Sequence, residues 1–450
     1  MERREFLALL AAPAYAEMVR RIGWQAPPEN QKAEVTLRIS AIELEVAQGK
    51  MIKTTGYNGS APGPILRLPE GKPVRVDVFN DTKIPELVHW HGLFVPSELD
   101  GSAEEGTPTV PPGGMRRYSF LPRPSGTRWY HSHISAGRDM KRATYTGQFG
   151  FLYIEPKEDS GEYDAEVFLA LHGWDAYLSS QGEGTLEVMY RAYSMNGHAL
   201  GSGEPIRVKE GQNVLLRILN ASATEQHRIA LPGHKFKVLA LDGNAVAVPR
   251  EVDTIVMGPA ERVDAVVTMN RPGVWILGEA ADATRNAGLG VVVEYANRGE
   301  APQWNAPENT PWDYTLFGHE RESPQPTGGV VPLVFRKKFA GHNWVDNWTI
   351  NGKSFPKTDP IQVRANQRYR LRFDNQSDEA HPVHLHRHTF ELTRFAGKPT
   401  TGVRKDVIVV PPMKQVEVDF TADNPGATLF HCHQQLHMDY GFMTMLQYES

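Results

Sequence analysis

Three stretches of the chain repeat one pattern of apolar and polar positions. Each begins with an Asn-Gly pair, continues through short segments in which apolar and polar residues alternate, and ends on an asparagine. The pairs and closing asparagines are Asn58-Gly59 with Asn80, Asn196-Gly197 with Asn220, and Asn351-Gly352 with Asn375. Asn-Gly favours the tight turn of a β-hairpin, and alternation is typical of half-buried strands. The sequence therefore predicts an all-β fold of three consecutive β-sandwiches.

The spacing of these repeats and the polar stretches between them predict the domain boundaries. The repeats lie roughly 150 residues apart, which is the usual size of one domain. Stretches rich in polar residues and proline, near 156–164 and 297–311, separate them. We expect domains over residues 33–157, 163–297 and 312–450.

Composition narrows the class of protein. Of the 450 residues, 40% are hydrophobic and 22% charged, which is typical of a soluble globular protein. The net charge is −5 with no long basic run, which argues against a nucleic-acid partner or a membrane anchor. A single cysteine rules out an intrachain disulfide, and 17 histidines point to metal binding.

The N-terminus carries the features of an export signal. Arg3-Arg4 precede a short apolar run, and Ala14-Tyr15-Ala16 has the small-x-small form of a cleavage site. We expect a twin-arginine-type signal peptide over residues 1–16 and an exported protein, periplasmic or extracellular. The alternative is an ordinary N-terminal helix.

Four His-x-His pairs are the main candidate for chemistry. On a strand, residues i and i+2 point to the same face, so each pair offers two imidazoles to one side. Imidazole suits copper, zinc, iron or nickel. The pairs are His89 with His91, His131 with His133, His384 with His386, and His431 with His433.

The pairs occur only in the first and third units. The second unit aligns with His227-Arg228-Ile229 at the same place, where Ile229 replaces the second imidazole. We expect a metal site shared between the first and third domains, with the second domain as a spacer without metal. His227 and His234 are then polar surface or packing residues.

Cys432 stands between His431 and His433, so strand parity turns it toward the opposite face. His381, three residues before His384, also has opposite parity to its pair, and His437 follows Cys432 by five residues. Two histidines and a cysteine are the ligands of a blue-copper electron-transfer centre. The alternative is an inert buried thiol. Because the neighbours of Cys432 would belong to the other site, the chain itself would connect the two sites for electrons.

These motifs together resemble those of the three-domain multicopper oxidases, in particular the bacterial laccase-like ones. The matching segments are His89-Trp90-His91-Gly92, Trp129-Tyr130-His131-Ser132-His133, His381-Pro382-Val383-His384-Leu385-His386, and His431-Cys432-His433 with His437. The resemblance implies cupredoxin-like Greek-key domains and four copper ions per chain: one type 1, one type 2 and two type 3. It implies His381, Cys432 and His437 at type 1, His89 and His384 at type 2, and at type 3 His91, His131 and His433 on one ion and His133, His386 and His431 on the other.

The resemblance also implies an activity. Phenols or aromatic amines would lose single electrons at the type 1 copper, and dioxygen would be reduced to water at the other three. Asp100 matches the family's acidic residue near the type 2 copper and is expected to deliver protons, although an Asp before Gly also forms turns. The alternative function is oxidation of cuprous or ferrous ions in metal homeostasis. We expect a monomer whose partners are a small aromatic reductant and dioxygen.

Three positions depart from the family's pattern. Phe442, which cannot coordinate, stands where many bacterial relatives have an axial Met, and Met443 faces away by parity. Such a site is expected to have a raised type 1 potential. Met438 replaces a Glu found in some relatives, and Arg387 replaces a usual Gly for no reason visible in the sequence.

Overall fold

Strands account for nearly all of the regular structure. The computed structural model describes residues 31–158, 161–180, 185–308, 311–341 and 344–449, so the expected signal peptide lies outside the described residues. Among the described residues, no helix has the length and apolar character needed to span a membrane. The predicted all-β class is confirmed.

The strands fall into three successive groups. The first group is β1 (Val35–Ala47), β2 (Lys50–Tyr57), β3 (Leu66–Pro69), β4 (Val74–Asn80), β5 (Val88–His91), β6 (Met115–Phe120), β7 (Gly126–Ser132) and β8 (Phe149–Glu155). The second is β9 (Ala165–Trp174), β10 (Tyr177–Ser180), β11 (Leu186–Met189), β12 (Ala192–Met195), β13 (Ile206–Val208), β14 (Asn213–Asn220), β15 (His227–Ala230), β16 (Phe236–Leu241), β17 (Asn244–Val252), β18 (Thr254–Met257), β19 (Arg262–Thr268), β20 (Val274–Glu279) and β21 (Gly290–Tyr295).

The third group completes the chain. It is β22 (Val330–Lys338), β23 (Asn347–Ile350), β24 (Ile361–Val363), β25 (Arg368–Asn375), β26 (His381–Leu385), β27 (Phe390–Phe395), β28 (Lys398–Lys405), β29 (Val407–Val410), β30 (Gln415–Thr421), β31 (Thr428–Cys432) and β32 (Met443–Tyr448). The helices are short: α2 (Asp282–Asn286), α3 (Gln435–Asp439) and the 3-10 turns η1 (Ser97–Leu99), η2 (Ala143–Tyr145) and η3 (Tyr314–Phe317).

Each group forms a two-layer sandwich, and the layers repeat in the same order. The second group has sheets β12-β9-β14-β19-β16-β17 and β13-β21-β20-β15-β18, and the third has β23-β22-β25-β30-β27-β28 and β24-β32-β31-β26-β29. The first group is smaller, with sheets β2-β1-β4-β6 and β3-β8-β7-β5. By position, β5, β15 and β26 are equivalent strands, and so are β7, β20 and β31.

The repeated sequence signals have the same structural role in every domain. Each Asn-Gly pair has both residues at positive φ, as in Asn58 at 53° and Gly59 at 80°, which is the hairpin turn that the sequence predicts. Each closing asparagine pins a loop: its side-chain amide donates to a backbone carbonyl, and its oxygen accepts from the backbone N–H two residues later. Asn80, Asn220 and Asn375 all make this pair of contacts.

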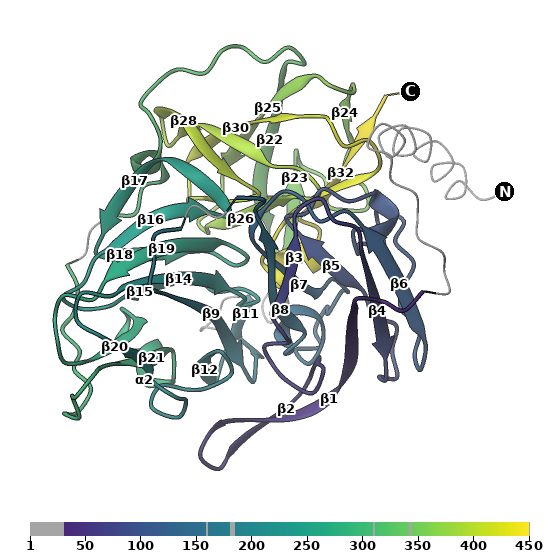
Figure 1. Ribbon diagram of the computed structural model, residues 1–450. Coiled ribbons are helices and arrows are strands. Elements are labelled where there is room, and N and C mark those ends of the chain that lie inside the picture. The colour runs from purple at the N-terminus through teal and green to yellow at the C-terminus, as the bar shows by residue number, and fades with distance from the viewer. Residues whose placement is uncertain (1–30, 159–160, 181–184, 309–310, 342–343, 450) are drawn as a thin grey trace.

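The three domains share apolar contacts with one another. One buried cluster joins Trp129 and Phe151 of the first domain, Phe168 and Trp174 of the second, and Val407 of the third. Figure 1 shows the consequence: the strands of the third domain, β22 to β32, lie beside those of both other domains. The ends of the described chain therefore pack together, as the division of the histidine pairs predicts.

A buried ion network also fixes the second domain to the third. Lys405, at the end of β28, is 1% exposed in its side chain and lies 2.9 Å from Asp242 and 3.0 Å from Glu261 of the second domain. Tyr314 donates its hydroxyl to Glu261 at 2.7 Å. Buried charges of this kind are stable only while each has its partner.

Replacing Lys405 should therefore destabilise the whole chain. Lys405→Met leaves two carboxylates buried without their cation, and we expect the free energy of unfolding to fall by about 3–5 kcal/mol. Urea unfolding followed by circular dichroism measures this. The control is Lys353→Met, which breaks an exposed pair with Asp359, 49% and 73% exposed, and should cost about 0–1 kcal/mol. Equal losses of unfolding free energy in the two variants would contradict a stabilising role of the buried ion network.

Candidate metal centres

Four strands carry the histidine pairs into one place between the first and third domains. His89 and His91 lie on β5, and His131 lies directly opposite His89 on β7. In the third domain His384 on β26 lies directly opposite His431 on β31. Because these strands are equivalent in the two domains, the sites face each other with similar geometry. All eight imidazoles are buried.

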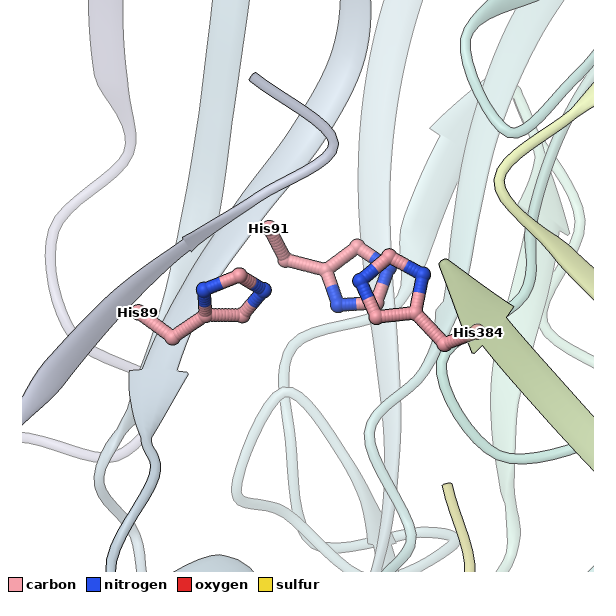
Figure 2. A group of neighbouring side chains, drawn as sticks. All are labelled: His89, His91 and His384. Atoms are coloured by element: carbon pink, nitrogen blue, oxygen red, sulfur yellow. The ribbon is translucent and has the colours of Figure 1, made fainter. Parts of the chain in front are cut away.

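The eight rings gather into groups of metal-binding size. The ligand nitrogens of His91, His131 and His433 lie within 4.8 Å of one another, and so do those of His133, His386 and His431. His89 and His384 form a third group with His91. Figure 2 shows these three rings converging from strands of the two domains. The rings of His91 and His384 are stacked, with centroids 3.8 Å apart.

The nitrogens at the centre of this cluster lack hydrogen-bond partners. Six buried ring nitrogens have none: Nε2 of His89, His131, His133, His384 and His433, and Nδ1 of His91. The remaining two, Nε2 of His386 and of His431, face each other at 3.0 Å. Buried polar atoms normally find partners, so eight inward nitrogens with none but one another fit a set of metal ligands.

The opposite nitrogens of the rings are held by two aspartates with matching roles. The carbonyl of Asp100 accepts from His89 Nδ1 at 2.7 Å, while its carboxylate accepts from His386 Nδ1 at 2.7 Å. The carbonyl of Asp406 accepts from His384 Nδ1 at 2.7 Å, while its carboxylate accepts from His91 Nε2 at 3.1 Å. Each aspartate thus orients one histidine of its own domain and one of the other.

Burial also keeps seven of these imidazoles neutral. It lowers the pKa of His133 to about 3, and it holds the pKa values of six others well below the usual range, with neighbouring histidines adding to the effect. Those six are His91, His131, His384, His386, His431 and His433. A neutral ring with its N–H bonded on one side leaves a lone pair on the other.

A second group lies on the other side of β31. Cys432 Sγ is 3.8 Å from His381 Nδ1 and 3.6 Å from His437 Nδ1, and the two nitrogens are 3.2 Å apart. Their Nε2 atoms are held from behind, by Ser377 for His381 and Glu379 for His437. Burial raises the pKa of the Cys432 thiol. The structure thus brings together all residues predicted for this site.

An aromatic ring packs against this group. Phe442 is fully buried, and its ring centroid lies 4.8 Å from that of His381. Met443 packs instead with Leu429 and Met438 in a separate small cluster. Parity therefore places these two residues as the sequence indicates, and the thioether is directed away from the group.

Carboxylates that the sequence did not reveal gather behind His437. Glu379 contacts His437 Nε2 at 3.2 Å, and Lys337 links Glu379 at 2.5 Å to Asp346 at 3.5 Å and Glu187 at 3.9 Å. Burial and the nearby Glu379 raise the pKa of Glu187 to about 7. These residues come from three distant segments, and the only signal for them was the position of Glu379 two residues before His381. Asp439, two residues after His437, does not join this group and accepts from the backbone N–H groups of Ala136 and Gly137 of the first domain.

A second buried acid lies beside Asp100. Glu105 accepts from the backbone N–H of Leu429 at 2.8 Å, and its other oxygen lies 3.3 Å from His386 Nδ1. Burial and the adjacent Asp100 raise the pKa of Glu105 well above its usual range. Asp100 itself keeps one oxygen, Oδ1, without a partner. The sequence pointed to Asp100 but not to Glu105.

The structure explains Arg387, which the sequence left open. Its backbone has φ 59°, which turns the chain after His386, and its side chain is 1% exposed. The guanidinium donates to four backbone carbonyls, those of Val95, Asn424, Pro425 and Ala427, and to the Thr428 hydroxyl. Arg387 thus joins the first domain to the segment leading into β31. His388 has both ring nitrogens bonded and is not free to bind a metal.

The second domain keeps the frame of the cysteine site and one of its histidines, but has Glu279 in place of the cysteine. In the sheet of the second domain His227 lies opposite Met257, and the Met257 carbonyl accepts from the Asn220 side chain. In the third domain His381 lies opposite Val410, and the Val410 carbonyl accepts from the Asn375 side chain in the same way. His227 is therefore equivalent to His381, and the alignment that placed it at a His-x-His position was wrong, because the loops before the strands differ in length. Both His227 and His234 are buried and bonded, to Ser222 and Glu279 and to Tyr295, and not on the surface.

Comparisons with known proteins agree with this geometry. Three family models, each described as multicopper oxidase, match residues 38–159, 173–295 and 332–450. The chain is 30% identical to Multicopper oxidase MmcO of Mycobacterium tuberculosis, over 94% of this chain and 88% of that one.

Solved structures show the same fold. Fet3p, a multicopper oxidase that functions in iron import, superposes with a TM-score of 0.80 at 19% identity, covering 92% of this chain and 90% of that one. The laccase from Botrytis aclada gives 0.75 at 22%, covering 92% and 87%. The chain therefore has three cupredoxin-like domains and belongs to the multicopper oxidase family, as an oxygen-dependent copper oxidoreductase.

Proposed function

We propose that the protein is a laccase-type oxidase that couples one-electron oxidation of phenols or aromatic amines to reduction of dioxygen to water. The observation that carries this is the pair of sites joined at one tripeptide, His431-Cys432-His433. A thiol with two imidazoles lies on one face of β31, and eight inward-facing imidazoles lie on the other.

The ligand assignment follows the groups in the structure. His381, Cys432 and His437 would hold the type 1 copper, and His89 and His384 the type 2 copper. His91, His131 and His433 would hold one type 3 ion, and His133, His386 and His431 the other. Four bound coppers would supply the redox chemistry, accepting single electrons from a donor and delivering four to dioxygen.

The residues around the cluster would supply an electron path between the two sites and a group that holds a proton. Cys432 and its two neighbours give a covalent path between the sites. Asp100 is buried with Oδ2 against His89 and His386 and with Oδ1 unpartnered, so it is placed to hold and pass a proton at Oδ1. A small cavity lined by His133, His431, Thr144, Gln435 and Met438 lies directly beside the proposed type 3 ligands.

The donor meets the protein near His437. Its imidazole is 2% exposed, and the carboxylate of Glu379 on its Nε2 can accept a phenol or amine proton as the electron leaves. The surrounding acids also support a second candidate function, oxidation of cuprous or ferrous ions, because carboxylates attract cations. Glu187 and Asp346 are the observation that favours it.

The remaining proposals rest on the sequence. Arg3-Arg4 and the Ala14-Tyr15-Ala16 site support export by the twin-arginine route, with a monomer as the working form. The domain boundaries at 33–157, 163–297 and 312–450 agree with the linkers and the strand groups.

Copper loading tests the proposed function directly. We expect about four coppers per chain, an intense visible thiolate-to-copper band, and oxygen uptake with a simple phenol. Cys432→Ser is the matched control: it should lose the band and turnover while keeping about three coppers. Wild-type protein without the visible band would overturn the proposal, and oxygen uptake with Cu(I) or Fe(II) but not phenol would favour the second candidate.

The axial position makes a separate prediction. Phe442→Met introduces a thioether on the side of the type 1 site that Phe442 now closes, and the added donor stabilises Cu(II) more than Cu(I). We expect the type 1 reduction potential to fall, measured by redox titration of the visible band. Met443→Leu, altering the methionine that packs elsewhere, is the control and should leave the potential unchanged. A potential that does not move in Phe442→Met would show that residue 442 is not axial.

The two candidate donors can be separated at Glu187. Assayed above pH 7, where the Glu187 carboxyl is ionised, Glu187→Gln removes one negative charge from the acidic group. KM for Fe(II) or Cu(I) should then rise a few-fold if cations are the donors, and less at high salt. KM for a neutral phenol should stay constant. Glu251→Gln, on an exposed part of β17, is the control for a change of net charge. A phenol KM that rises equally would mean that Glu187 shapes the surface and does not act by charge.

A further inference from the structure

The copper-free second domain reaches the trinuclear site through one buried arginine. Arg262, at the start of β19, is fully buried. Its guanidinium donates to both oxygens of Asp406, at 2.7 and 2.6 Å, in the two-pronged geometry that fixes a carboxylate in position and orientation. It also donates to the carbonyls of Ala260, Thr127 and Asp242. Arg262 therefore cannot shift without breaking contacts with all three domains.

Asp406 transfers this restraint to the histidines. Its carboxylate accepts from His91 Nε2 and its carbonyl from His384 Nδ1, so the same residue sets the rotation of both stacked rings. The backbone N–H groups of Asp406 and Val407 donate to Asp242 of the second domain, at 3.3 and 3.1 Å. The second domain thus holds both the side chain and the backbone of Asp406.

The glycine after His91 shows how tightly this contact is built. A Cβ on Gly92 would lie 2.7 Å from Asp406 Oδ2 and 3.0 Å from Arg262 Nη2. Gly92 also has φ +83°, a conformation that favours glycine. The carboxylate and the guanidinium therefore pack directly against the backbone that carries His91.

We propose that Arg262 is a positioning residue through which the second domain sets the geometry and retention of the type 2 copper at His384 and of the type 3 ion at His91. The inference rests on the proposed function, because it needs copper at His89 and His384. Partners that orient a metal-binding histidine change metal affinity about 10- to 100-fold when they are removed. The second domain is then part of the copper site and more than a spacer.

A second buried arginine of the same domain provides a matched control. Arg217 on β14 forms ion pairs within its own domain, with Asp264 at 2.6 Å and Glu166 at 2.6 Å. It also donates to the hydroxyl of Thr127 in the first domain at 3.1 Å. It contacts none of the predicted copper ligands or Asp406. Removing it should lower stability in the same way as removing Arg262, but should leave the copper ligands in place.

The test compares copper retention and spectra of the full-length copper-loaded protein. Wild type, Arg262→Gln, Arg262→Lys and Arg217→Gln are dialysed against a graded chelator and measured for copper content, the type 2 electron paramagnetic resonance signal, the visible band and melting temperature. We expect Arg262→Gln to lose type 2 copper at a chelator concentration about 10- to 100-fold lower than the wild type does. Its type 2 electron paramagnetic resonance signal should shift, and its visible band should be retained. Arg217→Gln should melt earlier with an unchanged type 2 signal.

Each result bears on one proposal. The positioning role would be overturned if Arg262→Gln kept its copper and its type 2 signal as the wild type does. It would also be overturned if Arg217→Gln lost as much copper as Arg262→Gln. If Arg262→Gln gives no folded protein, Arg262→Lys decides, because it keeps the charge but loses the two-pronged contact, and it should shift the type 2 signal. Wild-type protein that binds no copper would overturn the proposed function instead.

Discussion

The structure depends on keeping eight imidazoles buried, each with one ring nitrogen directed at the others. Such an arrangement is unfavourable by itself, because each inward nitrogen has lost its water and most have gained no hydrogen bond. It persists because the outward nitrogens are held and the strands behind them are rigid. The carbonyls of Ser132 and Cys432 hold His131 and His431, and the aspartates Asp100 and Asp406 hold four more rings. The site is thus oriented from behind before any metal binds.

Repetition of one domain explains how this arrangement is built. Equivalent strands in the first and third domains present equivalent histidine pairs, so two similar half-sites close into one cluster. In the second domain the strand equivalent to β31 carries Glu279 where the third domain has Cys432. Glu279 lies opposite Ile229, and Cys432 lies opposite Val383, which is the residue equivalent to Ile229. That domain has the same sandwich and a histidine, His227, at the position of His381, but no cysteine and no His-x-His pair. Its polar groups instead bind the other two domains, through Asp242, Glu261 and Arg262.

Much of this could be predicted from the sequence, because the signals are local. The Asn-Gly turns, the strand alternation and the His-x-His parity each depend on residues a few positions apart, and the structure places Cys432 on the face that parity gives. What escaped prediction depends on contacts between distant segments. Glu379 meets Glu187 and Asp346 only through Lys337, and Glu105 reaches Leu429 across a domain boundary. The register of His227 was missed because loop lengths before the strand cannot be read from the pattern alone.

Asp100 and Asp406 each orient one histidine of the first domain and one of the third, so the copper site connects the two ends of the chain. A copper held between His89 and His384 would join points about 300 residues apart, a loop whose closure costs only slightly more than that of a much shorter one, since the cost grows with the logarithm of length. The metal would therefore act as a cross-link between the two ends of the protein, with the second domain held inside the loop. Loss of copper would remove that cross-link, so metal content and the docking of the outer domains are thermodynamically coupled. An export route that carries folded proteins would deliver such a cross-linked chain with its ends already joined.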